Sequence, residues 1–150
     1  MKSPTALTER RRAELEAVAC ELLEMHGVDR PPVPIEDILR RPAADLWRPD
    51  LVDLSVQSFD ANERYAVRPT IARLVARYAA ETVWARRRGW VGAGGLSTDE
   101  IHYLGRALLM PKPWMAELSA GERTPSSVRV HFHVPVPDAA KRLIELLLVE

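Results

Sequence analysis

Two arginines one helical turn apart are the residues from which the chemistry of this chain is best judged. Arg73 and Arg77 lie at i and i+4, with Leu74 directly after the first. The two histidines of an HExxH zinc motif have the same spacing, and the glutamate between them serves as general base. Arginine stays protonated and offers no lone pair to a cation, and leucine cannot accept a proton from water. We therefore expect no metal and no cofactor at these positions.

Two segments of the chain carry a family resemblance. The first is Thr70-Ile71-Ala72 with the helix that follows it, and the second is Ser97–Pro111, which ends in Leu-Leu-Met-Pro. Together they resemble the ImmA/IrrE-type metallopeptidase family, in which Thr-Ile-Ala precedes the HExxH helix and a second helix carries a glutamate as third ligand before Leu-Leu-Met-Pro. Glu100 falls on that third-ligand position. The resemblance continues in residues 32–38 near the start and in 132–134 with 139–143 near the end, so it covers most of the chain, thinly.

The resemblance implies an α+β fold, a mainly helical zincin-like minimal peptidase scaffold with a small antiparallel β-sheet and a short helical C-terminal piece. The peptidase-like domain would cover residues 1–111, and a small helical extension packed on it would cover 112–150. The former metal and base positions would be Arg73, Leu74, Arg77 and Glu100. Because both histidines and the base are replaced, the resemblance implies a degenerate zinc peptidase without catalytic activity.

The resemblance also implies a function and a class of partner. Active members cleave or inactivate helix-turn-helix repressors, often encoded beside them on mobile elements or in stress-response loci. An inactive relative would act in transcription regulation as a protein-binding module, holding such a repressor without cutting it. The candidate partner-binding groove contains residues of both segments and one tryptophan beyond them: Arg73, Arg77, Glu100, His102 and Trp114.

Two alternatives remain open at this point. One is an active metallopeptidase with substituted ligands, drawn from His102, His131 and His133, with Glu100 as a further candidate ligand. The other is a DNA-binding regulator that uses the C-terminal helices, although few basic or amide side chains precede Ala139 at the start of the expected recognition helix. Metal content would test the first, and salt-dependent DNA binding would test the second.

Glu100 has two competing interpretations. If it points into the former metal cleft, Arg73 or Arg77 could hold its carboxylate bidentately and supply the charge that zinc supplies in active relatives. Alternatively, Ser97 and Glu100 form a capping box at the start of a helix. Arg77 could then pair with Glu81 on an exposed face, which contributes only a few tenths of a kcal/mol.

Hydrophobic periodicity predicts the elements that position these residues. A first amphipathic helix should cover 9–25 and end at Gly27, and the central helix should run from 70 to 88 with Leu74 on its inner face. Alternating apolar residues at 51–59 predict a half-buried strand, and 64–67 would be its partner. Short helices begin near Ile35 and Pro113, and further short segments follow Pro125 and Pro137.

Composition bounds the class of protein. The chain has 150 residues, 47% of them hydrophobic, and its 21 basic residues balance 21 acidic ones. This balance removes the general positive field behind strong nucleic-acid binding, so none is expected. A single cysteine, Cys20, excludes an internal disulfide, and no apolar run reaches the roughly 20 residues of a membrane span. We expect a cytoplasmic protein that does not enter membranes.

Overall fold

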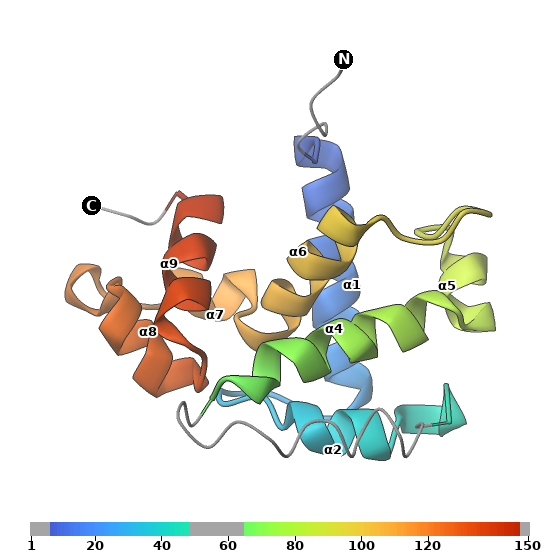
Figure 1. The fold of residues 1–150 in the computed structure, drawn as a ribbon, viewed down its shortest axis with the longest axis horizontal. Coiled ribbons are helices and arrows are strands. Elements are labelled where there is room, and N and C mark those ends of the chain that lie inside the picture. The colour runs from blue at the N-terminus through green and yellow to red at the C-terminus, as the bar shows by residue number, and fades with distance from the viewer. Residues whose placement is uncertain (1–6, 49–64, 148–150) are drawn as a thin grey trace.

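The computed structural model describes residues 7–48 and 65–147, and this part of the chain is helical (Figure 1). Two 3-10 turns, Ala43–Asp45 and Ala120–Glu122, lie between the helices. The α-helices in chain order are α1 (Glu9–Met25), α2 (Ile35–Arg40), α4 (Val67–Ala80), α5 (Val83–Arg88), α6 (Thr98–Leu109), α7 (Lys112–Ala116), α8 (Pro125–Phe132) and α9 (Val136–Glu145).

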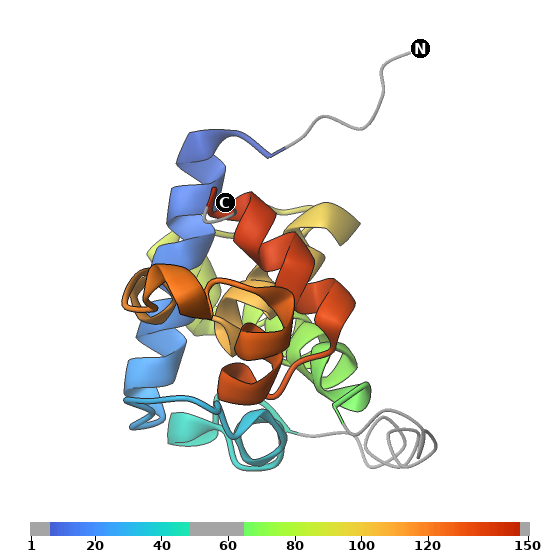
Figure 2. The same ribbon diagram turned by 90° about the vertical axis from the view of Figure 1, so that its left-hand side faces the viewer.

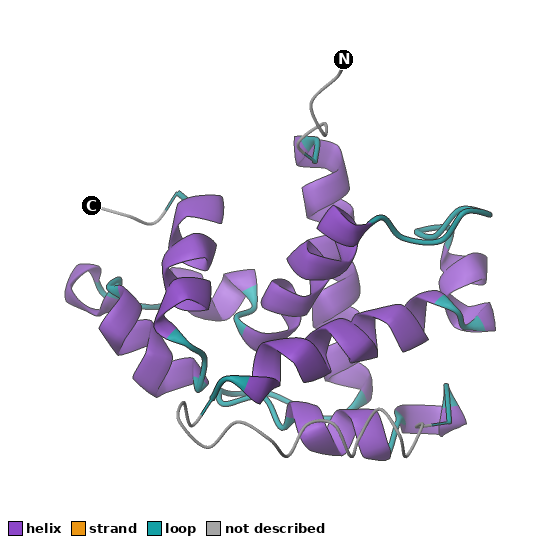
Figure 3. Ribbon diagram, viewed as in Figure 1, coloured by secondary structure: helices purple, strands orange, loops and turns teal. Residues whose placement is uncertain are grey.

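The predicted α+β fold is wrong, because residues 7–48 and 65–147 contain no strand (Figure 3). In the predicted strand 64–67, Tyr65 forms a turn and Val67 begins α4. Four alternating residues fit a helical turn as well as a strand. Arg68 fixes the helical form, since its buried guanidinium donates to the carbonyls of Val33 and His133, both at 2.7 Å. The predicted strand 51–59 lies outside the described residues.

Helix α1 confirms the prediction for 9–25 at both ends. Thr8 caps it, because its hydroxyl accepts a hydrogen bond from the Arg11 amide at 3.0 Å. Gly27 follows with a φ of +69°, in the left-handed region that glycine adopts without a Cβ penalty. The inner face of α1 contributes Leu15, Ala19 and Leu22 to the core, each at most 1% exposed.

The single central helix predicted for 70–88 is wrong, because α4 ends at Ala80 and α5 begins at Val83. Thr82 divides them. Its hydroxyl donates to the Ala79 carbonyl at 2.7 Å and accepts from the Ala85 amide at 3.1 Å, so it closes one helix and caps the next. A threonine hydroxyl competes with the hydrogen bonds of the helical backbone through such local bonds. The packing of the fold buries the Thr82 side chain.

Helix α4 lies between α2 and α6, and α6 packs against α1 on another side (Figure 1). Gly105 allows α4 and α6 to approach closely. A Cβ atom built on Gly105 would lie 3.2 Å from the Cγ atom of Arg73 and 3.4 Å from its backbone nitrogen. The absence of a side chain at Gly105 therefore determines the spacing of the two helices that carry the candidate site.

The C-terminal helices α8 and α9 pack on each other, and the end of α9 lies beside the first half of α1 (Figure 2). Arg142 makes this attachment with a side chain that is 0% exposed. Its Nη2 donates to Glu16 Oε1 at 2.7 Å, and its Nη1 donates to Glu16 Oε2 at 2.9 Å. Its Nε donates to the Met110 carbonyl at 2.9 Å. In the part of the chain that is described, no helix is long and apolar enough to cross a membrane.

Candidate functional site

A cleft of about 330 Å³ lies between α4 and α6. It brings together four residues that the sequence singled out: Arg73, Leu74 and Arg77 from α4, and His102 from α6. The register of the two helices explains this, because residues three and four apart lie on one face. The remaining lining residues are Thr70, Thr98 and Ile101.

Arg73 and Arg77 form the basic side of this cleft. Arg73 donates from Nη2 to the Thr70 hydroxyl at 3.2 Å, and Arg77 is exposed. Within residues 7–48 and 65–147, neither guanidinium forms an ion pair with a carboxylate, so the predicted pair between Arg77 and Glu81 is absent. Two cations one helical turn apart are thus available to an external carboxylate.

Leu74 forms an apolar floor between the two arginines. Only 9% of its surface is exposed, and it belongs to the core together with Ile71 and Val75, as the periodicity predicted. Ile101 is partly buried and contributes apolar surface from α6. The cleft therefore has cations above an apolar floor, and it offers no base at the Leu74 position.

Glu100 is turned away from Arg73 and Arg77, so the predicted pairing with either of them is wrong. The Oε1 atom of Glu100 accepts from the Ser97 amide at 2.8 Å, and the Ser97 hydroxyl accepts from the Glu100 amide at 3.1 Å. The Oε2 atom of Glu100 pairs with Arg11 of α1. The capping box is confirmed. Partial burial raises the pKa of Glu100, but the Ser97 amide and Arg11 outweigh this and hold the pKa below its usual value.

Trp114 does not line the cleft. It belongs to α7, where it is partly buried and packs against the core. Of the five predicted groove residues, Arg73, Arg77 and His102 line the cleft. Glu100 and Trp114 do not.

The histidines are not assembled into a metal site. His102 is on α6, His131 pairs with Glu122 at 3.2 Å, and His133 stacks on Tyr65 with ring centroids 4.7 Å apart. Within the described ranges, no group of three or more metal-ligating side chains comes together. Burial lowers the pKa of His102, and Arg73, Arg106 and Lys141 lower it further, so the uncharged imidazole is favoured.

Sequence reasoning missed a buried polar network that joins α1, α6 and α9. Besides its two bonds from Arg142, Glu16 accepts a hydrogen bond from the Tyr103 hydroxyl at 2.6 Å. Burial and the Glu16 carboxylate raise the pKa of Tyr103. The signal in the sequence was Glu16 itself, a charged residue between core positions Leu15 and Ala19, which requires a buried partner.

No family model, curated protein or solved structure matches this chain. The resemblance to ImmA/IrrE-type peptidases therefore stays a hypothesis based on the two segments quoted above. The cleft itself can be described by its chemistry: two guanidinium groups that form no ion pair with a carboxylate in the described ranges, an apolar floor and two threonine residues. These groups can bind a carboxylate beside an apolar side chain.

Proposed function

We propose that this chain is a non-catalytic protein-binding module whose α4–α6 cleft receives an acidic side chain of a partner. The observation that carries the proposal is the position of Arg73 and Arg77, which face an open cleft without a carboxylate partner in the described part of the chain. A guanidinium that forms no ion pair with a carboxylate of the described residues is suited to binding an anion from outside. Leu74, between them, gives the cleft apolar surface but no proton acceptor.

The binding free energy that the two arginines can supply is small. An exposed pair contributes about 0.2–1 kcal/mol, so the two arginines alone would supply at most roughly 2 kcal/mol. Affinity must then also come from apolar contact with Leu74 and Ile101, at about 25 cal/mol per Å² removed from water. We therefore expect the partner to present a carboxylate and an apolar group together, as a protein surface or peptide does.

The family resemblance supplies the partner class to test first. A degenerate ImmA/IrrE-like pseudopeptidase would regulate a helix-turn-helix repressor by binding it, and its former active-site helices would form the contact surface. The replaced positions support this, since Arg73 and Arg77 cannot hold zinc and are suited instead to charge recognition. The fold by itself does not determine function, so the proposal depends on the cleft.

Site-specific photo-crosslinking tests the proposal. A photo-reactive phenylalanine analogue would replace Thr70 or Thr98, which line the cleft, and Ser126 on α8 would be the control position. In cells that encode the chain, we expect both cleft positions to crosslink one protein that Ser126 does not capture. The predicted class of that protein is a helix-turn-helix repressor.

Charge reversal makes the test specific. The double variant Arg73→Glu/Arg77→Glu should abolish the crosslink, and Arg86→Glu/Arg87→Glu, which changes the same charge on exposed residues of α5, should keep it. Equal loss in both variants would indicate general charge attraction and would contradict the proposal. Persistence of the crosslink in the cleft variant would contradict it as well.

A further inference from the structure

His102 lines a second cleft in addition to the one between α4 and α6. The second cleft has a volume of about 620 Å³ and lies where α6 meets α9 and the start of α1. Because His102 belongs to both, the two clefts adjoin along the exposed face of α6. We refer to the combined feature, from Arg77 at one end to Ile144 at the other, as the α6 groove.

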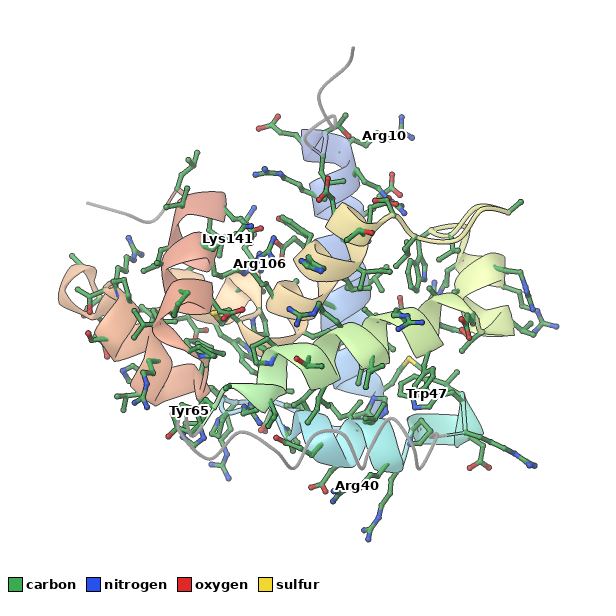
Figure 4. The ribbon with its side chains drawn as sticks, viewed as in Figure 1. Arg10, Arg40, Trp47, Tyr65, Arg106 and Lys141 are labelled. Carbon is green, nitrogen blue, oxygen red and sulfur yellow. The ribbon has the colours of Figure 1, made fainter. Side chains whose placement is uncertain are left out.

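The α6 groove is basic although the whole chain has a formal net charge of 0. The second cleft adds Arg12, Arg106 and Lys141 to the two arginines of the first. Arg106 and Lys141 come from facing helices, α6 and α9 (Figure 4). In the part of the chain that the structure describes, Lys141 forms no ion pair, so the groove has an unpaired cation on each wall.

Three carboxylates lie near these cations. Glu145 is engaged by Arg106 and Arg142, Asp99 lines the second cleft, and Asp138 lies close enough to Arg73 and Arg106 to interact with them electrostatically. They leave an excess of positive charge along the groove.

Apolar side chains accompany the cations on the α9 side. Ile144 is 59% exposed and Leu147 is 85% exposed, and both line the second cleft. At the other end, Leu74 and Ile101 supply the apolar floor. Large exposed aliphatic side chains beside an unpaired lysine are typical of a surface that binds an amphipathic partner.

We infer that the α6 groove binds an acidic amphipathic peptide segment of a partner, which contacts both the α4 wall and the α9 wall. The inference rests on the proposed function and extends it to the α9 half. Helix α6 has 12 residues and is about 18 Å long, so a partner helix of about 12 residues covers it. Carboxylates of the segment meet Arg77 and Lys141, and its apolar residues contact Leu74 and Ile144.

The groove fits a peptide better than a nucleic acid. A phosphate backbone has no apolar group to place on Ile144 or Leu147, which line the groove. Nucleic-acid surfaces of proteins are instead strongly basic and polar. An acidic peptide satisfies both the cations and the aliphatic side chains.

Selection from a displayed library of random peptides of about 12 residues, the length of α6 as a helix, tests the inference. We expect the selected peptides to combine Asp or Glu with Leu, Ile or Phe. Their binding would be measured by fluorescence anisotropy against the full chain and four single variants. Arg77→Glu reverses a charge on the α4 wall, and Lys141→Glu reverses one on the α9 wall. Ile144→Ser removes an apolar contact from the α9 wall. Val130→Ser, at a 65% exposed residue of α8, is the matched control.

The expected result is a loss of affinity of about tenfold or more for Arg77→Glu, Lys141→Glu and Ile144→Ser, and little change for Val130→Ser. Loss confined to Arg77→Glu would overturn the extended groove and leave the proposed function intact. Loss of affinity confined to Lys141→Glu and Ile144→Ser would contradict binding in the α4–α6 cleft, and with it both the proposed function and a groove that binds through two walls. Selected peptides without acidic residues, tighter binding of a single-stranded oligonucleotide, or no loss in any groove variant would overturn both.

Discussion

The buried pair of Arg142 and Glu16 allows a sharp test of what attaches α9 to the rest of the chain. The change is Arg142→Met, which has a similar length and no charge. It removes the two hydrogen bonds to Glu16, at 2.7 and 2.9 Å, together with those to the Met110 carbonyl and Glu145. Among the described residues, the Tyr103 hydroxyl is then the hydrogen-bond partner that remains to the buried Glu16. Removing one member of a buried ion pair costs about 3–5 kcal/mol, because the remaining charge is uncompensated.

That loss is large against the roughly 5–15 kcal/mol that stabilises a typical domain. It should lower the melting temperature by about 10 °C in a chain of this size. The measurement is urea unfolding followed by circular dichroism, with the free energy of unfolding extrapolated to water. The matched control is Arg87→Met on α5, an exposed residue whose replacement should change stability by less than about 0.5 kcal/mol.

A triple variant separates the cost of an unpaired charge from a general loss of packing. Glu16→Leu, Tyr103→Phe and Arg142→Met together replace the network with apolar side chains and leave no buried carboxylate. We expect this variant to be more stable than Arg142→Met alone. A buried ion pair often contributes no more to the free energy of unfolding than well-packed apolar side chains of similar volume. A loss below about 1 kcal/mol for Arg142→Met, or a triple variant less stable than the single one, would refute the reasoning.

Three further predictions concern α6 and the cleft. Gly105→Leu should destabilise the chain by about 1–3 kcal/mol, because its side chain would push Arg73 and α4 away, and urea unfolding against Gly121→Leu, at an open position, checks this. Because the pKa of Tyr103 is raised above its ordinary value of 10.0, the folded state holds this proton more tightly than the unfolded state, so stability should fall as pH rises above 10. Tyr103→Phe should remove that fall, and unfolding curves at increasing pH would contradict the assignment if both proteins lost stability equally. The native chain should contain no stoichiometric zinc by elemental mass spectrometry. Arg73→His/Leu74→Glu/Arg77→His, which adds two imidazoles to the cleft that His102 lines, should gain it, whereas stoichiometric zinc in the native chain would contradict a non-catalytic function.

Local signals in the sequence were sufficient for the two ends of α1 and for the start of α6. The bounds of α1 follow from Thr8 and Gly27, and the capping box at Ser97 and Glu100 needs only residues three apart. The break at Thr82 could not be predicted in this way. Threonine is tolerated within helices, and only the burial of its hydroxyl between two helix ends shows that it divides them.

Interactions between distant residues explain what the sequence did not predict about the site. Helical spacing correctly placed Arg73, Leu74 and Arg77 on one surface, and His102 joined them. The partner of Glu100 was missed because Arg11 is 89 residues away in the sequence. A sequence motif can place a residue on one face of a helix. Which residue its side chain contacts depends on the helix that packs against that face, as α1 does beside Glu100.

Helix α6 shows how the core determines the candidate binding surface. Gly105 sets its distance from α4, Tyr103 joins it to the Glu16 and Arg142 network, and His102 faces the groove between these two contacts. The α9 wall of the groove is therefore held by Arg142, whereas the α4 wall is held by Gly105. If the groove binds as inferred, Arg142→Met at a temperature where the chain stays folded should weaken contacts to Lys141 and preserve those to Arg77.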